Sequence, residues 1–219
     1  MPETHAVPSD AARAPSTALV IVDLQVDFLP GGRLAVPDGD AVVPLANRLA
    51  RRFETVVLTQ DWHPAGHISF ASSHPGHAPF DVITLPYGPQ VLWPDHCVQG
   101  EPGADFAPGL DVPHAQLIIR KGHHARVDSY STFYEADRRT STGLTGYLRA
   151  RGIANVVLMG LALDFCVAWS ALDAARDGFG TTVVEDACRA IDTHGSLHHA
   201  LEDMARAGVH SVRMADLAG

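Results

Sequence analysis

The stretch Val156-Val-Leu-Met-Gly-Leu-Ala-Leu-Asp-Phe-Cys-Val167 decides the expected fold, because it leads from a buried strand into a helix. Residues 155–159 form a valine-rich apolar run that is too short for a helix, which favours a core strand of a parallel sheet. Gly160 is expected to end this strand. Asp164 is then expected to cap a helix whose apolar residues recur at helical spacing until Gly178.

Cys166 is predicted at the second position of that helix. The free backbone N–H groups and the helix dipole at such a position favour a thiolate over a thiol. A lone cysteine is more often a small core residue, however. Residues elsewhere in the chain must therefore decide whether this thiol is a nucleophile.

Composition narrows the class of protein. A chain of 219 residues with 46% hydrophobic residues can bury one substantial core. Its formal net charge of −9 argues against nucleic acid and against acidic membranes as partners, and favours a small-molecule substrate. Three widely spaced cysteines (Cys97, Cys166 and Cys188) predict neither a disulfide framework nor a metal-binding C-x-x-C pair, so a reducing, cytoplasmic location is expected.

The domain organisation is expected to be simple. Residues 1–17 are rich in Pro, Ala, Ser and Thr and are predicted to form a flexible arm. Residues 18–219 are predicted to form a single domain, with no apolar stretch long enough to cross a bilayer. The oligomeric state is left open, and a homo-oligomer is compatible with the sequence.

Alternating strands and helices predict an α/β fold. The expected strands are 18–22, 55–59, 116–120, 155–159, 181–184 and 210–213, and the expected helices are 41–53, 142–151, 165–177 and 194–207. This alternation predicts a three-layer α/β/α, Rossmann-like domain with a six-stranded, mostly parallel sheet and right-handed crossovers. A long segment at about 61–113, dense in Pro, Gly and His, is expected to be a functional loop.

Three side chains at strand ends suggest thiol chemistry. Asp23, Lys121 and Cys166 follow different predicted parallel strands, whose carboxyl ends share one edge of the sheet. Cysteine attack on a carbonyl needs a proton carrier, positive charge and donors to the oxyanion. Asp23 can carry the proton and Lys121 can supply the positive charge. Backbone N–H groups of the turn 162–166 can donate to the oxyanion. Asp164 is a rival carboxylate, although its position suits capping better.

A metal site is predicted beside these residues. Asp61 and His63 are two apart at a strand end, so both side chains point the same way if the chain is extended. His67 follows in the same loop, and His96 returns from its far end. A carboxylate with two or three imidazoles suits zinc, iron(II) or manganese, and the sequence does not choose among these divalent metals.

Seven blocks of the chain together resemble a known family. They are Val22-Asp-Leu-Gln-Val-Asp-Phe28, Gly31-Gly-Arg-Leu-Ala-Val-Pro-Asp-Gly-Asp40, Thr59-Gln-Asp-Trp-His-Pro64, Leu92-Trp-Pro-Asp-His-Cys-Val98, Lys121-Gly122, Asp128-Ser-Tyr-Ser131 and Gly160-Leu-Ala-Leu-Asp-Phe-Cys-Val167. They resemble the bacterial nicotinamidases, or pyrazinamidases, of the isochorismatase-like cysteine hydrolase superfamily. The segment 123–127 matches poorly, and 163–165 differs from many members at the rim of the pocket.

The resemblance implies a role for each site residue. It implies a catalytic triad of Asp23, Lys121 and Cys166, and an oxyanion hole from the backbone of Ala162 and Cys166 beside a cis peptide after Leu161. It also implies one divalent metal on Asp61, His63 and His96, with His67 a further ligand in some members. Phe28, Trp93 and Tyr130 are implied to surround a pyridine ring.

The expected activity is hydrolysis of nicotinamide, and of pyrazinamide, to the acid and ammonia through a cysteine thioester. Another superfamily amidase, acting on an N-carbamoyl or ureido compound, is the nearest alternative and would not need the metal trio. A vinyl-ether hydrolase would not need Cys166. A non-catalytic protein that binds nicotinamide or senses oxidants through Cys97 and Cys166 is the alternative from another class.

Overall fold

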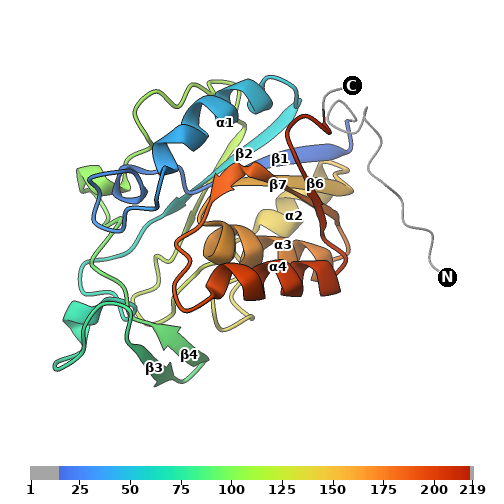
Figure 1. Ribbon diagram of the computed structural model, residues 1–219. Coiled ribbons are helices and arrows are strands. Elements are labelled where there is room, and N and C mark those ends of the chain that lie inside the picture. The colour runs from blue at the N-terminus through green and yellow to red at the C-terminus, as the bar shows by residue number, and fades with distance from the viewer. Residues whose placement is uncertain (1–14, 218–219) are drawn as a thin grey trace.

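The computed structural model describes residues 15–217, and six strands form its central sheet (Figure 1). Across the sheet the order is β5-β2-β1-β6-β7-β8, and every neighbouring pair is parallel. The strands are β1 (Thr17–Val22), β2 (Thr55–Asp61), β5 (Leu117–Lys121), β6 (Asn155–Leu161), β7 (Gly180–Arg189) and β8 (His210–Val212). The predicted six-stranded α/β sheet is confirmed.

Helices cover both faces of the sheet. They are α1 (Val43–Ala50), α2 (Leu144–Ala150), α3 (Ala168–Arg176) and α4 (Ser196–Arg206). Figure 1 shows α1 on one face and α3 with α4 on the other, and α2 lies on the side of α3. Right-handed crossovers require this division, because the chain moves from β1 to β2 in one direction and from β6 to β7 in the opposite one.

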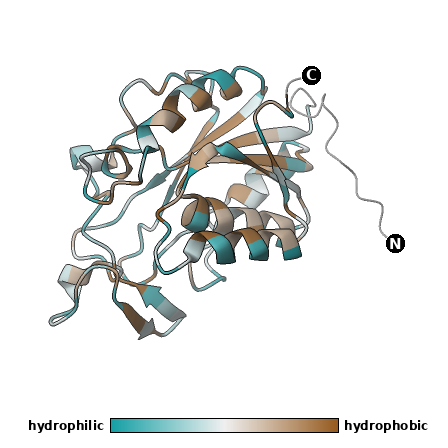
Figure 2. Ribbon diagram, in the orientation of Figure 1, coloured by the Kyte–Doolittle hydropathy of each residue, from teal (hydrophilic) through white to brown (hydrophobic). Residues whose placement is uncertain are grey.

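The two central strands are buried along nearly their whole length. All six residues of β1 are buried, and in β6 only Asn155 is exposed. A strand covered by helices on both faces needs apolar residues at consecutive positions, which explains the continuous apolar runs in the sequence. Figure 2 shows this hydrophobic sheet between helices whose outer surfaces are hydrophilic.

The chain reverses its winding direction between β1 and β6. In an open parallel sheet such a reversal leaves a crevice at the carboxyl ends of the two strands. Asp23 directly follows β1, and the turn that carries Cys166 directly follows β6. The topology therefore brings these two residues to the crevice from positions far apart in the sequence.

Two predicted element boundaries were wrong. Asp40 does not cap the first helix, because it lies inside a 3-10 turn (Gly39–Val42) and α1 begins at Val43. Pro44 suits the first turn of a helix, where an N–H group has no intrahelical partner in any case. Gly160 does not end the strand before Cys166, since β6 continues through Leu161.

The long segment after β2 contains structure that the sequence did not reveal. A hairpin of β3 (Val82–Leu85) and β4 (Gly88–Val91) projects from the body of the molecule (Figure 1). Four-residue strands that are half exposed leave only a weak alternating pattern. Of the predicted N-terminal arm, residues 1–14 lie outside the described residues, and Thr17 already belongs to β1. Within residues 15–217, no helix is both long and apolar enough to span a membrane.

We expect Gly160→Ala to lower the free energy of unfolding by about 3 kcal/mol or more. Gly160 has φ of +124°, and an added Cβ would lie 2.1 Å from the Val22 carbonyl oxygen of β1. Urea denaturation measures the effect. The matched control is Gly146→Ala in α2, where an added Cβ meets no atom within 4 Å and stability should stay equal or rise by up to about 1 kcal/mol. Equal unfolding midpoints for the two variants would contradict the packing argument.

Candidate active site

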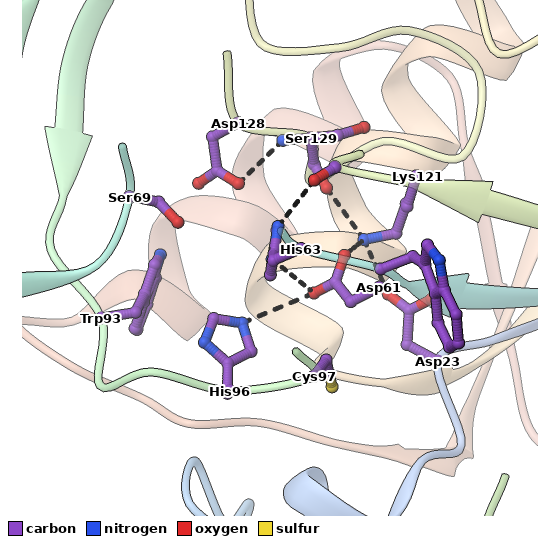
Figure 3. Close-up of polar contacts among 12 residues, drawn as sticks. Asp23, Asp61, His63, Ser69, Trp93, His96, Cys97, Lys121, Asp128 and Ser129 are labelled. Carbon is purple, nitrogen blue, oxygen red and sulfur yellow. Dashed lines mark hydrogen bonds and ion pairs between the residues drawn. The ribbon is translucent and has the colours of Figure 1, made fainter. Parts of the chain in front are cut away.

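The Lys121 ammonium joins the residues predicted to do the chemistry. Its Nζ lies 2.9 Å from Asp23 Oδ2 and 3.4 Å from Cys166 Sγ, and its side chain is fully buried. It also donates to the Ser129 carbonyl at 2.8 Å and to the Asp61 carboxylate (Figure 3). The three side chains therefore converge as expected.

Lys121 is the only lysine of the chain, all other basic side chains being arginine or histidine. Burial lowers the pKa of Lys121, but the Asp23 and Asp61 carboxylates outweigh it and hold this pKa well above its ordinary value. The amine therefore stays charged. A compact ammonium can donate in three directions at once, whereas a planar guanidinium would not fit between two carboxylates and a thiol.

The structure corrects the expected state of the cysteine. Burial raises the pKa of the Cys166 thiol well above its ordinary value, and Lys121 only partly opposes this. Burial also raises the pKa of Asp23, against the lowering effect of Lys121. The resting cysteine is therefore a thiol, and the nearby carboxylate is a stronger proton acceptor than an exposed aspartate would be.

The turn that carries Cys166 differs from the predicted helix start. A π-helical turn (Leu163–Val167) precedes α3, so Cys166 lies before the regular helix. The peptide bond between Leu161 and Ala162 is cis, as the family resemblance implied. Outside helices and strands, no hydrogen bond between described residues uses the Ala162 N–H as donor, so this group remains available to a ligand.

Asp164 neither caps the helix nor reaches the thiol. Its carboxylate accepts hydrogen bonds from the N–H groups of Ile191 and Asp192 at 3.0 and 2.8 Å, and from the Ser196 hydroxyl at 2.5 Å. Ile191 and Asp192 lie in the loop between β7 and α4, and Ser196 is the first residue of α4. Asp164 therefore ties this loop to the turn that carries Cys166, and the capping prediction was wrong.

Asp61, His63 and His96 meet as a candidate metal-binding trio. Asp61 Oδ2 lies 3.6 Å from the Nε2 atoms of both imidazoles, and one ligand atom from each residue lies within 4.8 Å of the others. Figure 3 shows both rings facing this carboxylate. His63 Nδ1 lies 2.9 Å from the Gly122 carbonyl oxygen, and His96 Nδ1 lies 2.8 Å from the Pro94 carbonyl oxygen. These contacts place the ring protons on the Nδ1 atoms and leave both Nε2 lone pairs free.

The charges of the trio suit a cation. Burial opposes ionisation of Asp61, yet Lys121 and His63 hold its pKa well below its ordinary value. Burial disfavours a charged His63 imidazole, but Asp61 outweighs this effect and raises the pKa of His63. A carboxylate that remains ionised beside two oriented imidazoles is a suitable donor set for a divalent metal.

His67 lies next to this trio but is held by other partners. Its Nε2 faces the carbonyl oxygens of His124 and Val127 at 3.1 and 3.2 Å, so Nε2 carries the proton. Its Nδ1 lies 2.8 Å from the Ser69 hydroxyl, and its ring stacks on His63. Burial, followed by His63, lowers the pKa of His67 to about 4, so the ring is neutral. In this arrangement the His67 ring packs against the His63 ring.

A pocket opens between the thiol and the metal-binding trio. Phe28, Trp93 and Tyr130, which the resemblance implied, all line it together with Cys166 and Asp61. The Trp93 indole donates to the Tyr130 hydroxyl at 2.9 Å, which fixes both rings. The other lining residues are Leu34, His63, His96, Asp128, Ala162, Phe165 and Ile191.

Several supporting residues were missed from sequence. Gln90 of the β3–β4 hairpin donates to Asp128 at 2.7 Å and to the Tyr130 hydroxyl at 3.0 Å, which links the hairpin to the pocket. The Thr59 hydroxyl donates to Asp23 at 2.6 Å. Gln90 carries no sequence signal, whereas the Asp128-Ser-Tyr-Ser131 block, with its acidic residue beside a predicted pocket tyrosine, could have indicated Asp128.

Comparison with known proteins gives consistent matches. The Isochorismatase domain model matches residues 17–216. The nicotinamidase of Acinetobacter baylyi is 58% identical over 200 residues, which cover 91% of this chain and 94% of that protein. A solved nicotinamidase/pyrazinamidase of Acinetobacter baumanii is 58% identical with a TM-score of 0.93, covering 94% of this chain and 99% of that one. A Pyrococcus horikoshii pyrazinamidase solved with zinc is 36% identical with a TM-score of 0.75, and the match covers 91% of this chain and 100% of that one.

We expect Gly122→Ala to weaken metal binding at the trio by about tenfold or more. Gly122 has φ of +67°, and an added Cβ would lie 2.4 Å from His63 Cε1, so the imidazole must move and lose its bond to the Gly122 carbonyl. Metal content after dialysis against a competing chelator measures the change.

Gly152→Ala is the matched control for this variant. Gly152 has φ of +71°, so it carries the same backbone strain, but an added Cβ there meets no atom within 4 Å. Both variants should lose stability, and only Gly122→Ala should lose metal. Equal metal retention in the two variants would show that Gly122 does not position His63.

Proposed function

This chain belongs to the isochorismatase family and hydrolyses nicotinamide, and from that premise we propose that Asp23, Lys121 and Cys166 carry out the reaction through a cysteine thioester. One observation carries the proposal: a buried ammonium contacts both the carboxylate and the sulfur, at the end of an aromatic-walled pocket.

Acylation begins with a proton transfer from the thiol. One oxygen of Asp23, one of Asp61 and the Cys166 sulfur all lie within 4.8 Å of one another. Asp23 takes the thiol proton, and the sulfur attacks the carboxamide carbon to form a tetrahedral intermediate. Asp23 then gives this proton to the leaving nitrogen, so that ammonia departs and a thioester remains.

Deacylation repeats the proton transfer with water as the nucleophile. Asp23 takes a proton from a water molecule, and the resulting hydroxide attacks the thioester carbon. The carbon–sulfur bond breaks, nicotinate is released and the proton returns to the sulfur. Lys121 stays charged throughout, because its pKa is held above its ordinary range, and its positive charge favours the ionised forms of Asp23 and Cys166.

Backbone N–H groups are proposed to bind the oxyanion. The Ala162 N–H, which follows the cis peptide, and the Cys166 N–H lie in the turn that carries the sulfur. Donors fixed by the backbone need no reorganisation when charge develops on the carbonyl oxygen. Their position in the turn that carries the nucleophile supports this proposal.

The aromatic walls are proposed to hold the pyridine ring. Phe28, Trp93 and Tyr130 present apolar surface, and the Trp93–Tyr130 hydrogen bond keeps two of the rings fixed before substrate enters. A preformed pocket of this kind contributes affinity by lowering the ordering cost of binding. Pyrazinamide differs from nicotinamide by one ring nitrogen in place of carbon, and we propose it as a second substrate of the same pocket.

A divalent metal is proposed on Asp61, His63 and His96. The oriented Nε2 lone pairs and the ionised carboxylate fit zinc, iron(II) or manganese, and the zinc in the Pyrococcus pyrazinamidase supports the first of these. When bound, the ion supplies a Lewis acid able to anchor the pyridine nitrogen, directly or through water. We further propose that residues 18–219 act as one catalytic domain, which the family match over 17–216 supports.

We expect Cys166→Ala to reduce ammonia release from nicotinamide by at least about 1,000-fold while leaving nicotinamide binding essentially intact. The variant removes only the sulfur that forms the covalent bond. Ammonia release and calorimetric titration measure the two quantities. Cys188→Ala is the control, because Cys188 is also buried but its sulfur bonds to the Val184 carbonyl within β7. Substantial turnover by Cys166→Ala would eliminate the thioester mechanism.

We expect Lys121→Met to move the acidic limb of the kcat/KM profile to higher pH by about one unit or more. Lys121 lowers the pKa of Asp23, so its removal raises that pKa, and the base is then ionised only at higher pH. Circular dichroism should first establish that the variant is folded. Arg120→Met removes a neighbouring charge that lies over Trp62 and should leave the acidic limb in place. An unshifted limb in Lys121→Met would show that Lys121 does not tune the base.

A further inference from the structure

A second group of metal-ligating side chains lies outside the pocket. Ligand atoms of His123, His124 and Glu135 lie within 4.8 Å of one another. The two histidines follow β5, and Glu135 comes from a turn before α2.

Glu135 is a buried acid, and only one of its two carboxylate oxygens contacts a hydrogen-bond partner among the described residues. Its side chain is 2% exposed, and Oε1 lies 2.6 Å from His124 Nδ1. Oε2 is buried and has no hydrogen-bond partner among residues 15–217. A buried oxygen without a hydrogen-bond partner costs free energy, and this oxygen is free to act as a metal ligand.

The two imidazoles beside the Glu135 carboxylate are open to solvent. His123 and His124 are both exposed, and their ring centroids are 4.1 Å apart. Two imidazoles and one carboxylate are a donor set that binds zinc, with water completing the coordination. The buried oxygen would gain a charge partner, and the exposed rings would give the ion a path from solvent.

We propose that His123, His124 and Glu135 form a second divalent-cation site of the zinc class. The backbone of the same segment supports the first metal-binding trio, because the Gly122 carbonyl faces His63 Nδ1 and the His124 carbonyl accepts a bond from His67. Residues 122–127 therefore lie between the two sites. The ion in the second site fixes this segment from its solvent side.

Zinc binding by metal-free full-length protein tests the proposal. The protein is stripped with chelator and dialysed against buffered Zn²⁺, and the zinc bound per chain is measured by atomic emission. His123→Ala and Glu135→Gln should each bind one zinc fewer than the unaltered protein. His96→Ala should also bind one fewer, and the combination with His123→Ala should bind two fewer. The readout is zinc content, so it does not depend on the proposed catalytic mechanism.

His198→Ala is the matched control, because His198 is an exposed histidine 3.2 Å from Glu202 on the surface of α4. This variant should keep the full zinc content of the unaltered protein. His123 is exposed, so its replacement should not prevent folding, and a thermal melt verifies this. Saturation of the unaltered protein at one zinc per chain, or an unchanged zinc content in His123→Ala, would overturn the proposal.

Discussion

The structure depends on one buried ammonium between two carboxylates and a thiol. Lys121 has no exposed surface, and an unpaired charge at that depth would be strongly destabilising. Asp23 and Asp61 each contact it, so the charge is retained rather than lost to neutralisation. All three residues lie at the carboxyl ends of strands of the sheet: Asp23 follows β1, Asp61 ends β2 and Lys121 ends β5. The proposed catalytic chemistry and the stability of the core therefore rest on the same contacts.

Asp61 connects the two halves of the site. Its Oδ1 contacts the Lys121 ammonium, while its Oδ2 lies 3.6 Å from both imidazoles of the trio. A metal bound by that carboxylate, as proposed, would share this one anion with the Lys121 ammonium. Loss of either cation changes the field that the other experiences, because the separation is short and the surroundings exclude water. The substrate pocket lies directly against this shared carboxylate.

Two segments that are distant in sequence support the pocket through hydrogen bonds. The β3–β4 hairpin contributes Gln90, which bonds to Asp128 and Tyr130. The loop after β7 is tied to the turn of the nucleophile by Asp164. Because the walls are hydrogen-bonded before any ligand arrives, binding of a small flat ring needs little rearrangement. The aromatic pocket and the nucleophile are thus held in a fixed relation by polar contacts around them.

The sequence by itself determined the sheet, its parallel direction and the three residues at strand ends, because buried strands are apolar runs and their ends are marked by polar residues. Lys121 is the only lysine in a chain that otherwise uses arginine, and this was a further local signal. Only the tertiary structure decided that Cys166 rests as a thiol, that Asp164 binds a distant loop, and that His67 Nε2 faces backbone carbonyls. These properties depend on burial and on partners 27 or more residues away, which periodicity does not encode. Local pattern gives the position of a side chain along the chain, whereas its charge state and contacts follow from every segment that packs around it.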